Sequence, residues 1–546
     1  MKIDRRNFIK AASGIALASV AQSLPTLTSL SSQAQRGKRK VAVFFEQTFP
    51  SVDGVPINKH ALEVALDGYD TVFLGVKELK EQLTGSAFDL LITPYGSAFP
   101  KDSWNAILRY LKAGGNWVNL GGVPLSVPIR KGETEWKREV RQTAYHKKLG
   151  ITQAFPVSTA EIGSYNANPD ADGARGLVGE FKAEEIFEFY VRFTVTKDFP
   201  AEDGTAGARD AVLRPLVFAV TKEKRKLAAP FLQIDRLQGE FAGGRWLLAN
   251  FRGVIGAKAV RLLAEMALQG SMELTTCTSF ACYRDGEVPF FTVQLRRPKG
   301  DVEKLVQGDC RLEVLDEKER MIETLKVRLQ GRGSLVLGTA SLSLKKRESL
   351  SPGLYQVNAR INVSSLSTGK ETTVSHTTGF WVLDRKLLAG GKPFTVDENY
   401  LLRDGKPYVV TGTTYMISDV HRKFLFEPNP YIWNKDFAEM KQAGVNMVRT
   451  GIWTAWRNYM LDVGALNEAA LRALDAFILT ARKYDIPMIF TFFAFIPEQW
   501  GGENAYLDPR SVNAQKEFIT AFAHRYGEVN DLIWDLINEP SFCSSK

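Results

Sequence analysis

The stretch Ile533-Trp534-Asp535-Leu536-Ile537-Asn538-Glu539-Pro540 is an apolar, β-favouring run that ends in an Asn-Glu pair with a proline directly behind it. Such a run is typical of a buried strand in a parallel sheet. A carboxylate at its end lies at the mouth of the strand rather than along its side. In repeated βα folds the strand ends carry the chemistry, and sites built there draw residues from several strands. Glu539 is therefore the first candidate for a catalytic group.

Three more strands of this kind precede it, with helices between them. The predicted strands are 408–414, 445–449, 486–493 and 532–537, and the predicted helices are 433–443, 468–484 and 512–526. Four βα-type strands at near-equal spacing predict the first half of a (β/α)8 TIM barrel over residues 386–546, since a whole barrel takes about 250 residues. An Asp-Gly turn at Asp404-Gly405 predicts a short hairpin in front of it.

The second half of that barrel is expected to lie beyond Lys546. Either the chain is a C-terminally incomplete fragment or a partner supplies the missing strands. The fragment is favoured, because a half-barrel exposes unpaired strand edges that are hard to keep soluble alone.

Residues 271–385 change to short alternating strands separated by turn residues, without helices. The predicted strands are 290–295, 310–315, 325–329, 353–363 and 372–382. This pattern predicts an antiparallel β-sandwich. The turn Ser351-Pro352-Gly353 leading into a core strand is similar to a pattern of immunoglobulin-like domains in secreted glycosidases, and a spacer role is expected.

Residues 40–270 follow an α/β pattern. The predicted strands are 41–45, 69–74, 88–93, 116–120, 186–196 and 245–250, and the clearest helices are 102–113 and 257–268. The strand and turn 89–96, with the helix behind it, resembles the glutamine-amidotransferase-like domain of some β-galactosidase-type enzymes. Amidotransferase chemistry needs a cysteine nucleophile, but the first cysteine is Cys277, and Ser97 or Ser126 lacks a supporting motif. The resemblance implies a structural or assembly domain, compatible with a homo-oligomer.

Residues 1–35 have the pattern of an export signal: a basic start, an Ala-rich apolar run over 11–21 and a Ser/Thr/Gln-rich tail. The run is too short to cross a bilayer, so no membrane anchor is expected after its removal. The segment 4–10, with Arg5-Arg6 before Phe8, resembles a twin-arginine signal, which implies a periplasmic or extracellular protein. An ordinary secretory signal is the alternative.

The composition is that of an ordinary soluble protein, with 45% hydrophobic and 24% charged residues. The net charge of +9 is scattered rather than gathered in one stripe, so a nucleic-acid partner is not expected. Four cysteines are few for a disulfide scaffold. No histidine lies near them in the sequence, so a zinc site is not indicated. No metal and no cofactor are expected.

The endings Val445-Asn446-Met447-Val448-Arg449 and Leu536-Ile537-Asn538-Glu539-Pro540 resemble those of clan A glycoside hydrolases, most closely the cellulase-like family five and its β-galactosidase and β-mannosidase relatives. The resemblance implies that Glu539 is the general acid/base, that Asn538 bonds the sugar 2-hydroxyl and that Arg449 supports the catalytic carboxylates. A retaining mechanism needs a second carboxyl about 5–5.5 Å away. The family carries it on the seventh strand, which is expected beyond Lys546.

Flat aromatic rings cover the apolar faces of pyranoses, so rings at these strand ends suit a carbohydrate cleft. The further candidates for substrate binding are Tyr415, His421, Trp453, Trp456 and Trp500. For each ring, packing under the loops is the alternative. The prediction is an exported hydrolase of O-glycosidic bonds in poly- or oligosaccharides, inactive as the truncated chain. The rival is a non-catalytic carbohydrate-binding or assembly protein with a remnant barrel.

Overall fold

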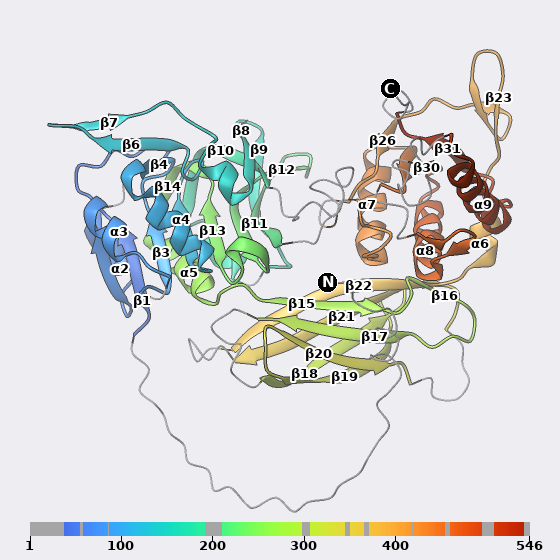
Figure 1. Ribbon diagram of the computed structural model, residues 1–546, viewed down its shortest axis with the longest axis horizontal. Helices are drawn as coiled ribbons and strands as arrows, with labels where there is room; N and C mark the ends of the chain where they lie inside the picture. The colour runs from blue at the N-terminus through green and yellow to red at the C-terminus, as the bar shows by residue number, and fades with distance from the viewer. Residues whose placement is uncertain are drawn as a thin grey trace, which may run out of the picture. The chain divides into compact units, whose positions relative to one another are not determined.

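The computed structural model describes residues 38–54, 58–85, 87–171, 173–191, 210–297, 306–343, 350–364, 371–417, 420, 422–453, 459–493 and 507–539. The predicted export signal lies outside these ranges. The residues from Arg39 onward belong to one unit, which contains an α/β segment, a β-sandwich segment and a C-terminal βα segment (Figure 1). Within the described ranges, no helix has the length and apolar character that crossing a bilayer requires.

An eight-stranded sheet organises the α/β segment, in the order β2-β1-β3-β5-β13-β12-β11-β9. The first five strands are parallel and the last three join antiparallel. Their bounds are β1 Lys40–Phe44, β2 Asp70–Leu74, β3 Leu90–Thr93, β5 Asn116–Leu120, β9 Ile162–Ala167, β11 Ala211–Thr221, β12 Lys226–Arg236 and β13 Arg245–Ala249. The four strands predicted between residues 41 and 120, and the one at 245–250, are confirmed with small shifts at their ends.

Both faces of this sheet are buried, as continuous apolar strands require. Along β1, Ala42 and Phe44 belong to one core, whereas Val41 and Val43 belong to the other. The covering helices are α2 Lys59–Ala65, α3 Val76–Gln82, α4 Trp104–Lys112 and α5 Ala257–Leu268. The helix predicted at 102–113 begins at Trp104, because Lys101–Ser103 form a 3₁₀ turn before it, and the Ser103 hydroxyl donates to the Val76 carbonyl at 2.9 Å.

Two small sheets complete the segment. One contains β4 Ala98–Pro100, β6 Val127–Lys131 and β7 Trp136–Arg138, and the other contains β8 Ile151–Ser158, β10 Phe181–Val191 and β14 Phe251–Ile255. The strand predicted at 186–196 thus starts earlier than expected and pairs in a separate sheet, while its residues from 192 onward lie outside the described ranges.

The sandwich segment has a three-stranded sheet, β15-β17-β20, and a five-stranded sheet, β16-β22-β21-β18-β19, around one apolar core. The bounds are β15 Glu273–Thr278, β16 Cys282–Tyr283, β17 Phe290–Arg296, β18 Val306–Leu315, β19 Met321–Gly331, β20 Leu335–Ser341, β21 Gly353–Ser364 and β22 Glu371–Val382. All five predicted strands are confirmed. The expectation of a purely antiparallel arrangement is wrong at one edge, because β16 pairs with β22 in parallel.

The sandwich packs directly on the C-terminal segment through β22. Trp381 of this strand belongs to the apolar core of the C-terminal segment, and its indole N–H donates to the Thr480 hydroxyl at 2.9 Å. The short helix α6 Arg385–Ala389 follows, and then the hairpin strands β23 Phe394–Val396, β24 Leu401–Arg403 and β25 Lys406–Pro407. Asp404 and Gly405 have φ of 54° and 71°, as a type I′ turn requires, which confirms the predicted hairpin.

The C-terminal segment is built on a four-stranded parallel sheet in chain order, β26-β27-β30-β31. Its elements are β26 Gly412–Thr414, α7 Pro430–Gln442, β27 Met447–Gly451, the hairpin β28 Met460–Asp462 and β29 Ala465–Leu466, α8 Glu468–Lys483, β30 Met488–Phe493, α9 Pro509–Tyr526 and β31 Leu532–Ile537. The three predicted helices and three of the predicted strands are confirmed. The first strand is shorter than predicted, because the Tyr408 backbone N–H bonds to Leu401 in the hairpin.

Candidate active site at the strand ends

Three polar side chains from neighbouring strands share the sheet face that is turned away from the helices. Trp534 of β31 packs on Phe492, with ring centroids 5.0 Å apart, and so marks the helix side. Because side chains alternate along a strand, Asp535 points the other way. The register places Thr491 of β30 beside Asp535. Arg449 of β27 lies on the same face, two positions before Gly451, which pairs with Thr491.

A single carboxylate oxygen ties these three strands together. Asp535 Oδ2 accepts hydrogen bonds from Arg449 Nη2 at 2.7 Å, from Arg449 Nε at 3.3 Å and from the Thr491 hydroxyl at 2.7 Å. The Arg449 and Asp535 side chains are 32% and 28% exposed, so water weakens the attraction between the charges. The contact therefore matters more for geometry than for stability, since a charge-assisted bond fixes the guanidinium plane.

The same arginine reaches the first residue beyond β31. Arg449 Nη2 donates to Asn538 Oδ1 at 3.0 Å, and the Asn538 backbone N–H donates to the Phe493 carbonyl at 3.0 Å. An arginine can only donate, so the oxygen of the Asn538 amide must face it. The amide nitrogen is then on the other side of the group.

Glu539 follows in a left-handed backbone conformation, with φ of 48°. This region is unfavourable for a residue with a side chain, and such conformations concentrate at functional sites. Its side chain is exposed, and it has no hydrogen-bond or ion-pair partner within the described part of the chain. An exposed carboxylate at the mouth of a strand is accessible to a ligand.

Trp453 is the one predicted aromatic that the described structure brings to this group. It follows β27, and the Arg449 guanidinium lies over its ring, 5.1 Å from the centroid, as a cation–π contact does. The residue is only 6% exposed. Its indole N–H has no hydrogen-bond partner among the described residues.

Tyr415 lies elsewhere. Its hydroxyl donates to Asp436 of α7 at 2.7 Å, and its ring stacks on Phe437 with centroids 5.7 Å apart. These contacts place the ring among the core side chains between the sheet and α7, apart from Asn538 and Glu539. The remaining predicted residues, His421, Trp456 and Trp500, lie outside the described ranges.

The sequence reasoning missed Asp535 and Thr491. Each is the one strongly polar residue within its strand core: Asp535 in Leu532–Ile537, and Thr491 in Met488–Phe493. A lone carboxylate in an apolar strand must find a partner when it is half-buried. That signal could have marked Asp535, although not its partner.

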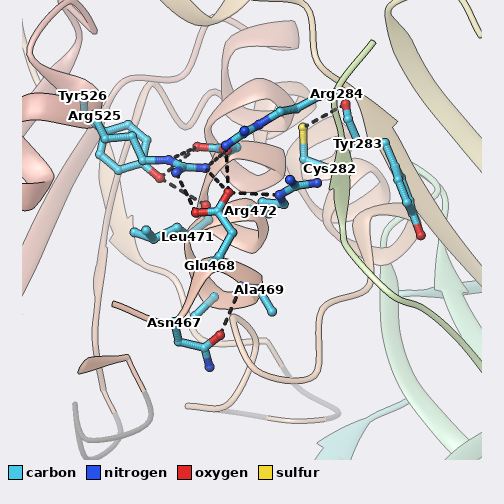
Figure 2. A network of polar contacts seen from close by, with 12 residues as sticks. Cys282, Tyr283, Arg284, Asn467, Glu468, Ala469, Leu471, Arg472, Arg525 and Tyr526 are labelled. Atoms are coloured by element: carbon cyan, nitrogen blue, oxygen red, sulfur yellow. Dashed lines mark hydrogen bonds and ion pairs between the residues drawn. The ribbon is translucent and has the colours of Figure 1, made fainter. Parts of the chain in front are cut away.

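A second arginine–carboxylate group joins α8 to the sandwich and to α9; Figure 2 labels its members Glu468, Arg472 and Arg525. We call it the outer network; its members are Glu287, Glu468, Arg472, Asp475 and Arg525. Arg472 donates to Glu287 at 2.6 and 3.0 Å and to Glu468 at 3.0 Å. Arg525 donates to Glu468 at 3.0 Å and to Asp475 at 2.5 Å. Each carboxylate therefore has at least one guanidinium partner.

These contacts shift the acidity of the network's glutamates. The hydrogen bonds from Arg472 hold the pKa of Glu287 below its usual value. For Glu468, burial acts to raise the pKa, but the hydrogen bonds from Arg472 and Arg525 outweigh it, and the net pKa is lowered. Carboxylates held ionised in this way are poor proton donors near neutral pH. We therefore expect the outer network to stabilise the fold and not to donate protons to a ligand.

Two other places in the described structure are weaker candidates for an active site. A cavity of about 480 Å³ lies between the sandwich and the start of α8, with Thr276, Phe280 and His376 among its lining residues. It is not lined by the strand-end group, our name for Arg449, Thr491, Asp535, Asn538 and Glu539. In the α/β segment, Ser97 is fully buried, so a substrate cannot reach its hydroxyl, which donates to Asp53 at 2.6 Å and accepts from the Val123 N–H at 2.8 Å. Within the described ranges, no cluster of three or more metal-ligating side chains occurs.

Several solved structures match parts of the chain. A calcium-binding mutant of β-glucuronidase 2 from Bacteroides uniformis is 15% identical over 49% of this chain and 28% of its own, with a TM-score of 0.20. The endo-1,4-β-mannanase of Rhizomucor miehei is 20% identical over 27% of this chain and 48% of its own, with a TM-score of 0.23. An exo-β-1,4-mannosidase from Opitutaceae bacterium strain TAV5 is 18% identical over 24% and 25%, with a TM-score of 0.22.

The chain thus spans less than a third of the length of the β-glucuronidase. No curated protein sequence matches it. One family model does, and it covers the part of the chain that carries Arg449, Asn538 and Glu539: residues 404–546 match the cellulase family, glycosyl hydrolase family 5.

Proposed function

We propose that this protein is an exported glycoside hydrolase that cleaves O-glycosidic bonds of poly- or oligosaccharides with retention of configuration, and that Glu539 is its general acid/base. The observation that carries the proposal is the exposed carboxylate of Glu539 at the mouth of β31, which has no partner among the described residues and lies next to an Asn538 amide held by Arg449. It lies within the segment that matches glycosyl hydrolase family 5.

In the first step, Glu539 gives its proton to the glycosidic oxygen as the bond to the anomeric carbon breaks, and a second carboxylate attacks that carbon. In the second step, Glu539 takes a proton from a water molecule, which displaces the enzyme carboxylate from the sugar. Asn538 would hold a sugar hydroxyl during both steps. Asp535 does not suit the part of nucleophile, because one of its oxygens already accepts three hydrogen bonds.

The second carboxylate is proposed to come from a part of the barrel outside the described residues. Both edges of the four-stranded sheet suit such a continuation. Gly412–Thr414 of β26 are exposed along one edge, and Leu536 of β31 is 57% exposed at the other. Open edges are normally paired or protected in stable proteins.

We also propose that the protein is exported by the twin-arginine route, and that its α/β segment is an amidotransferase-like domain with a role in assembly.

The test compares Glu539→Gln with Glu528→Gln, an exposed glutamate between α9 and β31. Activity is measured as reducing-sugar release from β-linked polysaccharides and as hydrolysis of aryl glycosides. Loss of general acid/base catalysis should slow natural substrates about 10²–10⁴-fold. The loss should be smaller for aryl glycosides with activated leaving groups, which need little protonation. Glu528→Gln should behave as the parent protein.

Equal losses on both kinds of substrate would contradict the role of Glu539. Carbohydrate binding without any hydrolysis, by a protein that also carries the second carboxylate, would favour the rival hypothesis of a non-catalytic binding protein.

A further inference from the structure

We propose that Asp535 is a positioning residue: through Arg449 it fixes which end of the Asn538 amide the ligand meets. The inference rests on the proposed function for the identity of the ligand, a sugar oxygen. The contacts themselves are independent of that function. Asp535 belongs to β31, Arg449 to β27 and Thr491 to β30, so three strands converge on one carboxylate oxygen.

The first step is the restraint on Arg449. Its guanidinium is planar, and two nitrogens along one edge, Nε and Nη2, both donate to Asp535 Oδ2. The Trp453 ring lies 5.1 Å from the guanidinium carbon and restrains its position from another side. A planar group held along one edge and against a ring has little freedom to turn.

The second step is the bond that this restraint directs. Nη2 has two N–H groups, and when one is given to Asp535 the other points to Asn538 Oδ1, 3.0 Å away. Asn538 is also held through its backbone by the Phe493 carbonyl. The amide oxygen is therefore committed to Arg449, and the amide nitrogen can only donate. A ligand oxygen at that nitrogen must accept a hydrogen bond.

The third step is what happens without the Asp535 charge. Asparagine at position 535 keeps the size of the side chain but replaces one oxygen with an NH₂ group and removes the attraction for Arg449. Arg449 would then no longer be confined to the Asn538 oxygen, and the amide could present either end. The change is felt only by substrates that use this amide.

The experiment compares Asp535→Asn with Asp485→Asn in the full chain. Asp485 is a well-matched control, because it is also paired with an arginine, Arg403 at 2.5 Å, and it lies just before β30 at the opposite end of the sheet. Each variant is assayed on a parent glycoside and on its monodeoxy analogues, which lack one hydroxyl each. Losing a hydrogen bond to a neutral oxygen should lower kcat/KM about tenfold.

The expected result is specific to one hydroxyl. Asp535→Asn lowers kcat/KM for the parent glycoside but has no further effect on the one analogue that lacks the hydroxyl bound by Asn538, whereas Asp485→Asn changes neither. Thr491→Val, which removes one donor and keeps the ion pair, gives a smaller loss and serves if Asp535→Asn does not fold. An equal loss on every analogue would show a merely structural role and overturn the inference.

A crystal structure of the Asp535→Asn protein separates this inference from the proposed function. If a protein that also carries the second carboxylate hydrolyses no glycoside, the proposed function fails, but the contact is still tested. A displaced Arg449 guanidinium or a turned Asn538 amide supports the positioning role. An unchanged contact between Arg449 and Asn538 overturns it.

Discussion

The outer network and the strand-end group are built from the same chemistry and differ in how completely their charges are matched. In the outer network, Arg472 and Arg525 between them contact all three carboxylates, Glu287, Glu468 and Asp475. At the strand ends, Arg449 contacts Asp535 but not Glu539, which is exposed. The first arrangement lowers the pKa of Glu287 and Glu468, whereas the second leaves one carboxylate exposed to solvent.

The positions of the two groups fit this difference. The outer network lies on the helix side of the C-terminal segment, where α8 contacts Glu287 of the sandwich and α9 contacts α8 (Figure 2). The strand-end group lies on the opposite face of the sheet, where Ile489 and Ile533 are only partly buried. The paired charges of the outer network thus lie between packed elements, whereas the carboxylate of Glu539 lies where a ligand can reach it.

The largest effect is expected from breaking the outer network. Arg525→Met leaves Asp475, whose side chain is 8% exposed, without its guanidinium partner. Removing one member of a buried ion pair should lower the free energy of unfolding by about 3 kcal/mol. Chemical denaturation followed by circular dichroism measures it.

The control lies in the same helix. Arg510 is paired with Asp508 but is 75% exposed, so Arg510→Met should change stability by less than about 0.5 kcal/mol. Equal effects at Arg525 and Arg510 would mean that burial of the network does not matter.

A smaller effect of opposite sign is expected at the strand ends. Glycine adopts the left-handed conformation of Glu539 without strain, so Glu539→Gly should raise the free energy of unfolding by about 1 kcal/mol while abolishing activity. Glu539→Ala removes the same carboxylate but keeps the strain, and it should give no such gain. Thermal unfolding of the two variants checks this, and equal melting temperatures would argue against strain at this residue.

The smallest effect is expected on the way the melting temperature falls when the pH is lowered. The pKa values of Glu287 and Glu468 are lower in the folded protein than their usual values. Their contribution to stability is therefore present above the unfolded pKa, about 4.3, and is lost as the pH falls through the folded pKa values. Melting temperatures between about pH 7 and 3 should fall less steeply in Glu287→Gln than in the parent protein. Parallel curves would show that Glu287 contributes nothing to the acid sensitivity.

Local patterns in the sequence predicted much of the C-terminal segment. β31 has the predicted bounds, 532–537, because its run is apolar apart from Asp535 and is closed by Asn-Glu-Pro. β26 is shorter than predicted, since the backbone of Tyr408 is used by the hairpin before it. Apolar periodicity shows that a stretch can form a strand but not which neighbour takes its hydrogen bonds.

The contacts of the site needed three-dimensional information. Asp535 and Arg449 are 86 residues apart, and their contact depends on the register of β27, β30 and β31, which no local pattern encodes. Tyr415 shows the converse. It was expected in the cleft because it follows the first strand, yet its hydroxyl bonds to Asp436 and its ring is buried beside Phe437. Position after a strand does not tell which way a ring turns.

The alternation of Trp534 and Asp535 restricts how this part of the gene can change in length. Inserting one residue before Trp534 within β31 would reverse the two faces. The carboxylate would then face Phe490 and Phe492, and the indole would leave the aromatic core that it now shares with them. We therefore expect single-codon insertions in the strand to destroy fold and site together, while insertions in the exposed turn at Gly527-Glu528 are tolerated.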